Sequence, residues 1–277
     1  MSGATTGRAA VLGSPIAHSL SPVLHRAAYA AMGLDGWSYE AVECGEDGLG
    51  AFLDGLGPDW AGLSLTMPLK RVALGLVDTV SDLAVRVGGA NTIVLRGGRR
   101  HGENTDVYGI ETALAEAGLK APASALVLGG GATAASALAA LAGLGTREAV
   151  LAVRTPERAA GTAGVGERFG LAVRVVTLDR VPAQLPADLV VSTLPGRAAD
   201  TFAEPVAESG AALFDVVYAP WPTVLAATVQ RAGGTVVGGF EMLLHQAVRQ
   251  VALMTGREDV PVEAMRAAGE AELARRG

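Results

Sequence analysis

The chain has 277 residues, and its 22 basic and 28 acidic residues give a formal net charge of −6. Half of the residues are hydrophobic and 18% are charged, which is enough apolar material for the core of one large or two modest domains. The densest basic cluster, Arg99, Arg100 and His101, is too small to give the footprint of a nucleic-acid-binding protein, and we interpret it as a solvent-exposed hairpin turn. We therefore expect no nucleic-acid partner.

Three features indicate a cytoplasmic protein without a membrane segment. The single cysteine, Cys44, excludes an intramolecular disulfide, and a buried thiol is its favoured interpretation. The first residues, MSGATTGRAA, lack the basic and apolar regions of a signal peptide. The uncharged stretch 121–146 is long enough to cross a bilayer, but its three consecutive glycines favour a strand, a turn and a buried helix.

The first part of the chain alternates β-type runs with helix-length segments. Strands are predicted over 8–14, 37–43 and 61–66. A helix is expected from Ser21 to Met32, with Ser21 as its cap and Pro22 in its first turn. A second helix is expected over MPLKRVALGLV, residues 67–77. The runs ANTIVLR and RRHGENT flank Gly97 and Gly98, a pattern that predicts a hairpin.

The second part of the chain repeats strand–helix units. A helix over 107–117 is followed by the plausible linker APAS, a strand over 125–128, a glycine turn and a helix over 134–145. Five more β-runs follow, over 148–154, 171–178, 188–194, 212–219 and 234–239. Repeated strand–helix units predict a parallel, right-handed doubly wound sheet, so the expected fold class is α/β. The two helices after residue 239 have no sheet of their own and must pack on another part of the chain.

The glycine turn fits the strand–G-x-G-x-x-G/A–helix fingerprint of a dinucleotide site at Gly129, Gly131 and Ala134. Glycines allow the sharp turn and the close approach of a pyrophosphate, and the helix amides then face the phosphates. The residues expected around the phosphates are Gly129, Gly130, Gly131, Ala132 and Thr133.

The cations that follow the second strand of this unit favour NADP over NAD. An NAD site usually has an acidic residue there for the ribose 2′-hydroxyl. This chain has Arg154, Thr155 and Arg158, which suit a 2′-phosphate, although Glu157 lies between them.

Polar side chains gather at predicted strand ends of the first part. Thr66 ends a strand, and Lys70 lies in the first turn of the expected helix, where the helix dipole would lower its pKa and suit it to proton transfer. Asn91 and Asp106 follow at other strand ends. A solvent-exposed lysine, a turn asparagine and a helix-capping aspartate are the alternatives for each alone. Together they favour a polar substrate pocket, because ligands of open α/β sheets bind at strand ends.

These motifs resemble those of the shikimate dehydrogenase family. The resemblance covers nearly the whole chain, in the order GSPIAHSLSPVLH, LTMPLK, GGANT, GENTDVYG, LGGGATA, VRTPER, DVVYAPWPT and GFEMLLHQA. It implies a reversible hydride transfer between NADPH and the carbonyl carbon of 3-dehydroshikimate, with no metal. It also implies a discontinuous substrate-binding domain, 1–106 with 239–277, a Rossmann-type NADP-binding domain, 107–238, and a cleft between the two domains.

The resemblance also implies roles for individual residues. Lys70 and Asp106 would be the catalytic pair that relays the proton. Ser19 and Ser21 would bind the substrate carboxylate, as neutral donors that add no positive charge beside the lysine. The remaining substrate residues would be Thr66, Asn91, Tyr218 and Gln246. Residues near the cofactor would be Thr193, Val216, Gly239, Met242 and, by a looser match, Asp82.

Three alternatives stay open from the sequence. The family motif that Arg154 belongs to usually opens with asparagine, where this chain has Val153, so the preference for NADP is an expectation. The substrate of such a site could be quinate or an aminoshikimate instead of shikimate. A non-catalytic sensor of nucleotide and shikimate-like ligands is a third possibility, disfavoured because Lys70 and Asp106 are both present. Monomer and homodimer are both compatible with the sequence.

Overall fold

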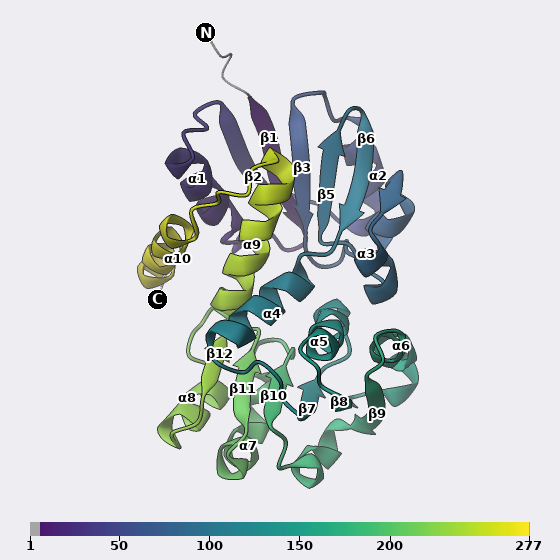
Figure 1. The fold of residues 1–277 in the computed structure, drawn as a ribbon, viewed down its shortest axis with the longest axis vertical. Coiled ribbons are helices and arrows are strands. Elements are labelled where there is room, and N and C mark those ends of the chain that lie inside the picture. The colour runs from purple at the N-terminus through teal and green to yellow at the C-terminus, as the bar shows by residue number, and fades with distance from the viewer. Residues whose placement is uncertain (1–5, 277) are drawn as a thin grey trace. The chain divides into compact units, whose positions relative to one another are not determined.

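The structure is a computed structural model, and it describes residues 6–276, so the first five residues of the stretch tested for a signal peptide lie outside it. The chain divides into two compact units (Figure 1). The first comprises the described parts of Met1–Thr105 and Leu244–Gly277, and the second comprises Asp106–Leu243. In the part of the chain that is described, no helix has both the length and the apolar character needed to span a bilayer.

The sheet of the first unit is mixed. Its strands are β1 (Gly7–Gly13), β2 (Trp37–Glu43), β3 (Trp60–Leu65), β4 (Thr79–Val80), β5 (Thr92–Arg96) and β6 (Arg99–Glu103), in the order β2-β1-β3-β5-β6-β4. β1 pairs in parallel with β2 and β3, whereas β5 is antiparallel to β3 and β6. The predicted hairpin is confirmed, and its turn residues Gly97 and Gly98 both have positive φ.

Helices cover both faces of this sheet. One face packs on α2 (Glu46–Asp54), the 3₁₀ turn η1 (Val72–Gly75) and α3 (Asp82–Val87), through a core that includes Leu12, Leu63 and Ile93. The other face carries α9 (Gly239–Thr255), while α10 (Val262–Arg276) packs along α1 (Ser21–Ala31) (Figure 1). Alternation along the strands turns Ser64 and Thr92 to the α9 face, since their neighbours Leu63 and Ile93 point to the opposite core.

The sheet of the second unit is parallel throughout. Its strands are β7 (Ser124–Leu128), β8 (Glu148–Val153), β9 (Ala172–Thr177), β10 (Leu189–Ser192), β11 (Ala212–Asp215) and β12 (Val236–Gly238), in the order β12-β11-β10-β7-β8-β9. This is the doubly wound α/β sheet that the sequence predicts. The strand order proceeds from β7 in both directions, to β8 and β9 on one side and to β10, β11 and β12 on the other.

Helices also cover both faces of the second sheet. One side has α4 (Asp106–Glu116), α5 (Ala132–Gly143) and α6 (Ala160–Arg168), which pack on one another in that order. The other side has η3 (Leu178–Gln184), η4 (Gly196–Phe202), α7 (Ala203–Ser209) and α8 (Val224–Arg231), around Leu126, Leu213 and Phe202. The strand expected within 121–146 is β7 and the buried helix is α5, with the glycine turn between them. The buried residues of α5 are mostly alanines and leucines.

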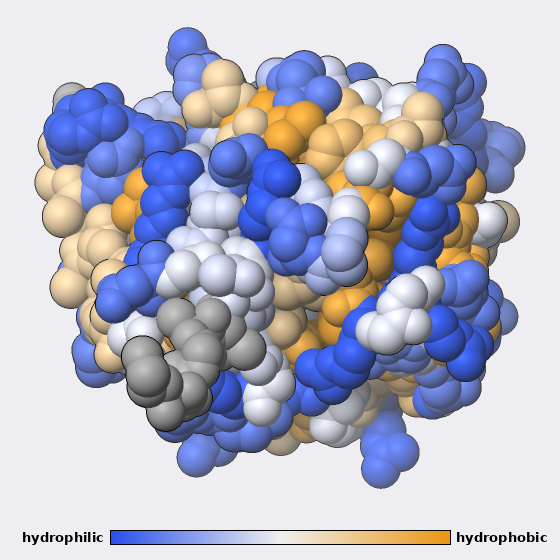
Figure 2. All heavy atoms as spheres, turned by 90° about the horizontal axis from the view of Figure 1, so that it is seen from above, coloured by the Kyte–Doolittle hydropathy of each residue, from blue (hydrophilic) through white to orange (hydrophobic). Residues whose placement is uncertain are grey.

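Cys44 is buried directly after β2, and burial raises the pKa of its thiol. The interpretation of a buried thiol is therefore confirmed. Figure 2 shows one face of the molecule, where hydrophobic patches lie between hydrophilic side chains. Apolar atoms make up a large share of any folded protein's surface, so these patches alone do not indicate a partner.

Candidate active site

One edge of the first sheet gathers most of the predicted substrate residues. The carboxyl ends of β1, β3 and β6 meet the amino end of β5 there, because β5 runs antiparallel to its neighbours. Backbone bonds join these ends: Thr66 N–H donates to the Leu12 carbonyl at 2.9 Å, and Asn91 N–H donates to the Glu103 carbonyl at 3.0 Å. Thr66 and Asn91 therefore leave the sheet at the same edge.

The serine loop, residues 13–21, begins at this edge. Its start is held by Ser14 N–H, which donates to the Met67 carbonyl at 2.9 Å, and a Cβ on Gly13 would collide with Thr66. Ser19 is half-buried and Ser21 is buried. The loop thus starts beside Thr66 and leads through Ser19 to the entrance of α1 at Ser21.

The prediction that Ser21 caps its helix is wrong. Leu20 occupies the cap position without a side-chain cap bond, and Ser21 is the first residue of α1. The Ser19 hydroxyl instead accepts the Ser21 N–H at 3.2 Å. The two serines therefore have different surroundings, because only Ser21 faces the buried side of the helix.

Asn91 and Gln246 form a buried pair of amides whose orientation follows from a backbone group. Thr105 N–H can only donate, and it donates to Asn91 Oδ1 at 2.7 Å. Asn91 Nδ2 consequently faces the Gln246 Oε1 atom at 3.3 Å and the Thr105 hydroxyl at 2.9 Å. Gln246, which lies on α9, must then point its NH2 group away from Asn91.

The helix predicted around Lys70 does not form. Residues 67–71 are turns, followed by the four-residue η1, so the argument from a helix dipole does not apply to Lys70. The physical reason is tertiary: the Lys70 carbonyl accepts Ala90 N–H at 2.8 Å, and Leu74 N–H bonds the Arg71 carbonyl instead. Lys70 itself is half-buried, and its backbone packs against Gly89.

Asp106 and Tyr218 belong to the second unit. Asp106 is the first residue of α4 and is 3% exposed, directly after Thr105. Tyr218 is half-buried in the loop after β11.

The loop after β11 is held by Asp215, which accepts Val217 N–H at 3.2 Å and the Thr223 hydroxyl at 2.7 Å. Burial raises the pKa of the Asp215 carboxyl, against the opposing effect of these hydrogen bonds. The sequence reasoning missed Asp215, whose only signal was its place at a strand end before a proline-rich loop.

The glycine turn of the second unit has the shape that a dinucleotide phosphate needs. Gly129 has φ +107°, and a Cβ there would collide with the Thr193 hydroxyl, which donates to the Leu128 carbonyl at 2.9 Å. Gly131 is the cap of α5 and supplies no side-chain cap bond, so the first helix amides face outward. Gly130 and Thr133 complete the turn with Ala132, the first residue of α5.

Arg154, Thr155 and Arg158 are exposed in and before η2 (Pro156–Arg158), at the carboxyl end of β8. This end lies at the same edge as the glycine turn, because β7 and β8 are parallel neighbours and Gly129 N–H donates to the Ala152 carbonyl at 2.9 Å. The residues present therefore fit a dinucleotide with a 2′-phosphate.

Two further predicted cofactor residues contact each other. A Cβ on Gly239 would collide with the Val216 carbonyl, so glycine is required where α9 begins beside the loop after β11. Met242 is buried on the next turn of α9. Asp82 belongs to the first unit; it is exposed at the start of α3 and pairs with Arg86 at 3.7 Å.

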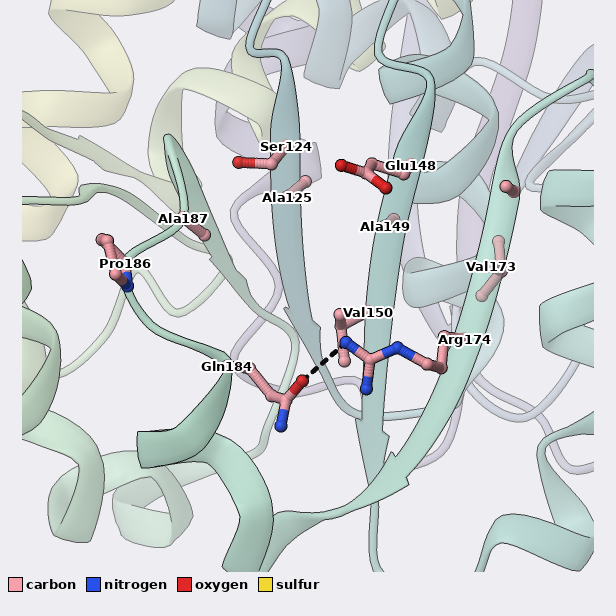
Figure 3. A pocket seen from close by; sticks show the side chains of 11 residues that line it. Ser124, Ala125, Glu148, Ala149, Val150, Val173, Arg174, Gln184, Pro186 and Ala187 are labelled. Atoms are coloured by element: carbon pink, nitrogen blue, oxygen red, sulfur yellow. Dashed lines mark hydrogen bonds between the residues drawn. The ribbon is translucent and has the colours of Figure 1, made fainter.

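A hollow of about 350 Å³ lies at the opposite edge of the second sheet (Figure 3). The amino ends of β7, β8 and β9 line it, and Arg174 donates to Gln184 across it at 2.7 Å. None of the predicted cofactor residues lines this hollow. Because the glycine turn follows the carboxyl end of β7, the hollow is separate from the predicted cofactor site.

Two family models match the chain, the shikimate dehydrogenase substrate binding domain over residues 11–93 and the shikimate 5′-dehydrogenase C-terminal domain over residues 239–268. A shikimate dehydrogenase (NADP(+)) of Moorella thermoacetica is 38% identical over 276 residues, which cover 95% of this chain and 92% of the relative. The chain belongs to the shikimate dehydrogenase family.

Solved structures agree with this membership. The shikimate dehydrogenase of Mycobacterium tuberculosis superposes with a TM-score of 0.89 at 44% identity, covering 96% of this chain and 99% of that one. The Thermus thermophilus enzyme in complex with NADP(H) and shikimate gives 0.83 at 35% identity, over 96% and 99%. A quinate dehydrogenase from Corynebacterium glutamicum in complex with NAD gives 0.86 at 27% identity, over 96% and 99%. The predicted family and fold class are confirmed.

Proposed function

We propose that this protein catalyses the reversible reduction of 3-dehydroshikimate to shikimate, with NADPH as the reductant. The observation that carries the proposal is the full-length similarity to shikimate dehydrogenases (NADP(+)), together with a polar edge of the first sheet that holds the matching side chains. Consistent with this, we assign the first unit to substrate and the second unit to NADP(H).

Bound NADPH supplies a hydride to the carbonyl carbon of 3-dehydroshikimate. A proton must reach the carbonyl oxygen in the same reaction, and we assign its delivery to the Lys70 ammonium. Asp106 accepts a hydrogen bond from the hydroxyl that forms and keeps Lys70 directed at that oxygen. In the reverse direction Lys70 takes the proton as hydride leaves, so the lysine acts as acid or base according to direction.

The remaining polar groups hold the substrate ring. Ser19 and Ser21 donate to the carboxylate as neutral groups. Thr66, Asn91 and Gln246 bind ring hydroxyls. Tyr218 lines the substrate from the second unit.

On the cofactor side, the outward amides of α5 receive the pyrophosphate. Arg154 and Arg158 bind the 2′-phosphate, with Thr155 as a further donor. Val216, Gly239 and Met242 lie beside the nicotinamide. Asp82 remains the weakest assignment, since its carboxylate is exposed and paired with Arg86.

The test is a matrix of two alcohols and two cofactors: shikimate and quinate, each with NADP⁺ and NAD⁺. The absorbance of the reduced cofactor measures the rate of turnover in each combination. We expect the highest kcat/KM for shikimate with NADP⁺. Well-folded protein that turns over neither alcohol contradicts the proposal and favours a ligand sensor.

Quinate is the second candidate, because a quinate dehydrogenase that was solved with NAD superposes over nearly the whole chain. Quinate carries an extra hydroxyl on the carbon that bears the carboxylate, so it needs space beside Ser19 and Ser21. A higher kcat/KM for quinate with NAD⁺ than for shikimate with NADP⁺ would establish this alternative.

A further inference from the structure

A buried run of hydrogen bonds crosses the α9 face of the first sheet. The Tyr39 hydroxyl on β2 donates to the Ser64 hydroxyl on β3 at 2.6 Å, and Ser64 donates to Gln250 Oε1 on α9 at 2.8 Å. Gln250 Nε2 then donates to the Asn91 carbonyl at 3.3 Å and to the Thr92 hydroxyl at 3.0 Å. Gln250 is only 1% exposed, so its amide cannot exchange these partners for water without opening the core.

One backbone atom determines the direction of every donor in this run. The Asn91 carbonyl can only accept, so Gln250 must turn its NH2 group to β5 and its Oε1 atom to the other side. Ser64 and His25 both approach that oxygen, at 2.8 and 3.3 Å, and each must donate. Ser64 has a single proton, which it gives to Gln250, so Tyr39 must donate to Ser64.

The run reaches the side chain of Asn91 through Thr92. The Thr92 hydroxyl accepts from Gln250 Nε2 and donates its own proton to Asn91 Oδ1 at 3.0 Å. Gln250 therefore holds Asn91 twice, directly at the backbone carbonyl and, by way of Thr92, at the side-chain oxygen.

We propose that Gln250 is a positioning residue of the substrate site: it holds the Asn91 backbone by direct contact and orients the Asn91 amide through the Thr92 hydroxyl. The inference rests on the proposed function, in which Asn91 binds a ring hydroxyl of the substrate. Gln250 contributes no substrate contact of its own. Its loss affects the substrate side and leaves NADP(H) binding by the second unit as it is.

The first test is steady-state kinetics of Gln250→Met, which keeps the side-chain length and removes every hydrogen bond. We expect KM for shikimate to rise about 5- to 30-fold, the range that one or two lost positioning bonds correspond to. KM for NADP⁺ should stay at the wild-type value, and kcat should change less than KM. Val251→Ala is the matched control, because Val251 is the next residue of α9, is fully buried and belongs to no hydrogen bond of the run. It should lower the unfolding temperature and leave KM unchanged.

The second test combines each variant with Asn91→Ala. If Gln250 acts through Asn91, the double variant Gln250→Met/Asn91→Ala should weaken shikimate binding less than the sum of the single changes, whereas Val251→Ala/Asn91→Ala should be additive. Should Gln250→Met fail to fold, Thr92→Val removes only the intervening hydroxyl and enters the same cycle.

The outcomes separate the two proposals. Wild-type protein that does not turn over shikimate overturns the proposed function and this inference with it. An active wild type overturns the inference alone if Gln250→Met and Thr92→Val keep the wild-type KM for shikimate, or if their effects add to that of Asn91→Ala.

Discussion

Lys70 is a half-buried amine in a turn, with its backbone carbonyl bonded to Ala90 N–H at 2.8 Å. This anchor matters for the proposed chemistry, because a flexible side chain can deliver a proton reproducibly only from a backbone that does not move. The turn therefore positions the amine that a helix was expected to position.

We expect Lys70→Ala to lower kcat by about 10²- to 10⁴-fold, the usual contribution of a general acid–base group, while shikimate still binds. Stopped-flow turnover and equilibrium binding of shikimate check the two parts separately. Arg71→Ala, which changes an exposed cation at the next position, is the control and should behave as wild type. A variant that mainly loses binding would show that Lys70 holds the substrate and does not transfer the proton.

His25 gives the fold an acid-sensitive point. The ring is fully buried, stacked on Tyr39 at 3.9 Å, and burial lowers its pKa to about 3. Nε2–H donates to Gln250, whereas Nδ1 has no partner among residues 6–276, so protonation would leave a buried N–H unsatisfied. The folded-state pKa is below that of the unfolded chain, so the stability present above pH 6.5 is lost as the pH falls toward 3.

Between pH 7.5 and 5.0 this group should remove about 2 kcal/mol from the free energy of unfolding, from 1.36 kcal/mol per unit over about 1.5 units. His25→Phe keeps the stacking on Tyr39 and should show a correspondingly smaller loss. Urea unfolding of both proteins at both pH values measures the difference, with the exposed His18→Ala as a control for losing one histidine. Equal losses in wild type and His25→Phe would show that other groups cause the acid sensitivity.

At the scale of the element, the strand–turn–helix unit β7–α5 depends on a single glycine conformation. Gly129 combines a positive φ with the collision that a Cβ would make with Thr193, whereas Gly131 has φ −85° and open space around its Cβ. The two glycines of the fingerprint therefore have different reasons to be glycine. Gly129 serves the fold of the turn, whereas the proposed function requires Gly131 to keep the helix entrance open for phosphate.

Gly129→Ala should lower the free energy of unfolding by about 1–3 kcal/mol, through backbone strain and the displaced Thr193. Gly131→Ala should leave that free energy close to wild type and raise KM for NADP⁺. Urea unfolding and cofactor kinetics on the same two proteins test the contrast. Equal loss of stability in both variants would mean that the turn tolerates no side chain anywhere, and that the two roles are not distinct.

At the scale of the whole molecule, the chain returns to its first unit after completing the second. α10 packs along α1, buries Met265, and its Arg276 donates to the His18 carbonyl at 2.8 Å, within the serine loop. The C-terminal helices therefore complete the first unit and support the loop that carries Ser19.

Ending the chain after Pro261 removes α10 and should raise KM for shikimate, because α1 and the serine loop lose their support. KM for NADP⁺ should not change. Burial of the Met265 side chain alone contributes about 1.5–3 kcal/mol to the free energy of unfolding, so we expect the shortened chain to be less stable as well. Arg276→Ala is the milder comparison, since it removes one bond to the loop and keeps the helix. A shortened chain with wild-type KM for shikimate would show that α10 has only a packing role.

The sequence by itself determined the α/β class, the hairpin at Gly97 and Gly98, the glycine turn and the family. These depend on periodicity and on local backbone conformation, which neighbouring residues decide. Even the candidate residues Lys70, Asn91 and Gln246 could be found in this way, because each lies in a short motif.

Tertiary structure alone decided how those residues are held. Ser64 and Gln250 are 186 positions apart and meet only because β3 and α9 pack in one register. The same kind of long-range bond, from Ala90 N–H to the Lys70 carbonyl, prevents the predicted helix. The bonds that hold Asn91 and Thr92 come from Gln250, which no local pattern marks. A hydrogen bond between distant segments depends on the register of the whole sheet, and that register is absent from any short stretch of sequence.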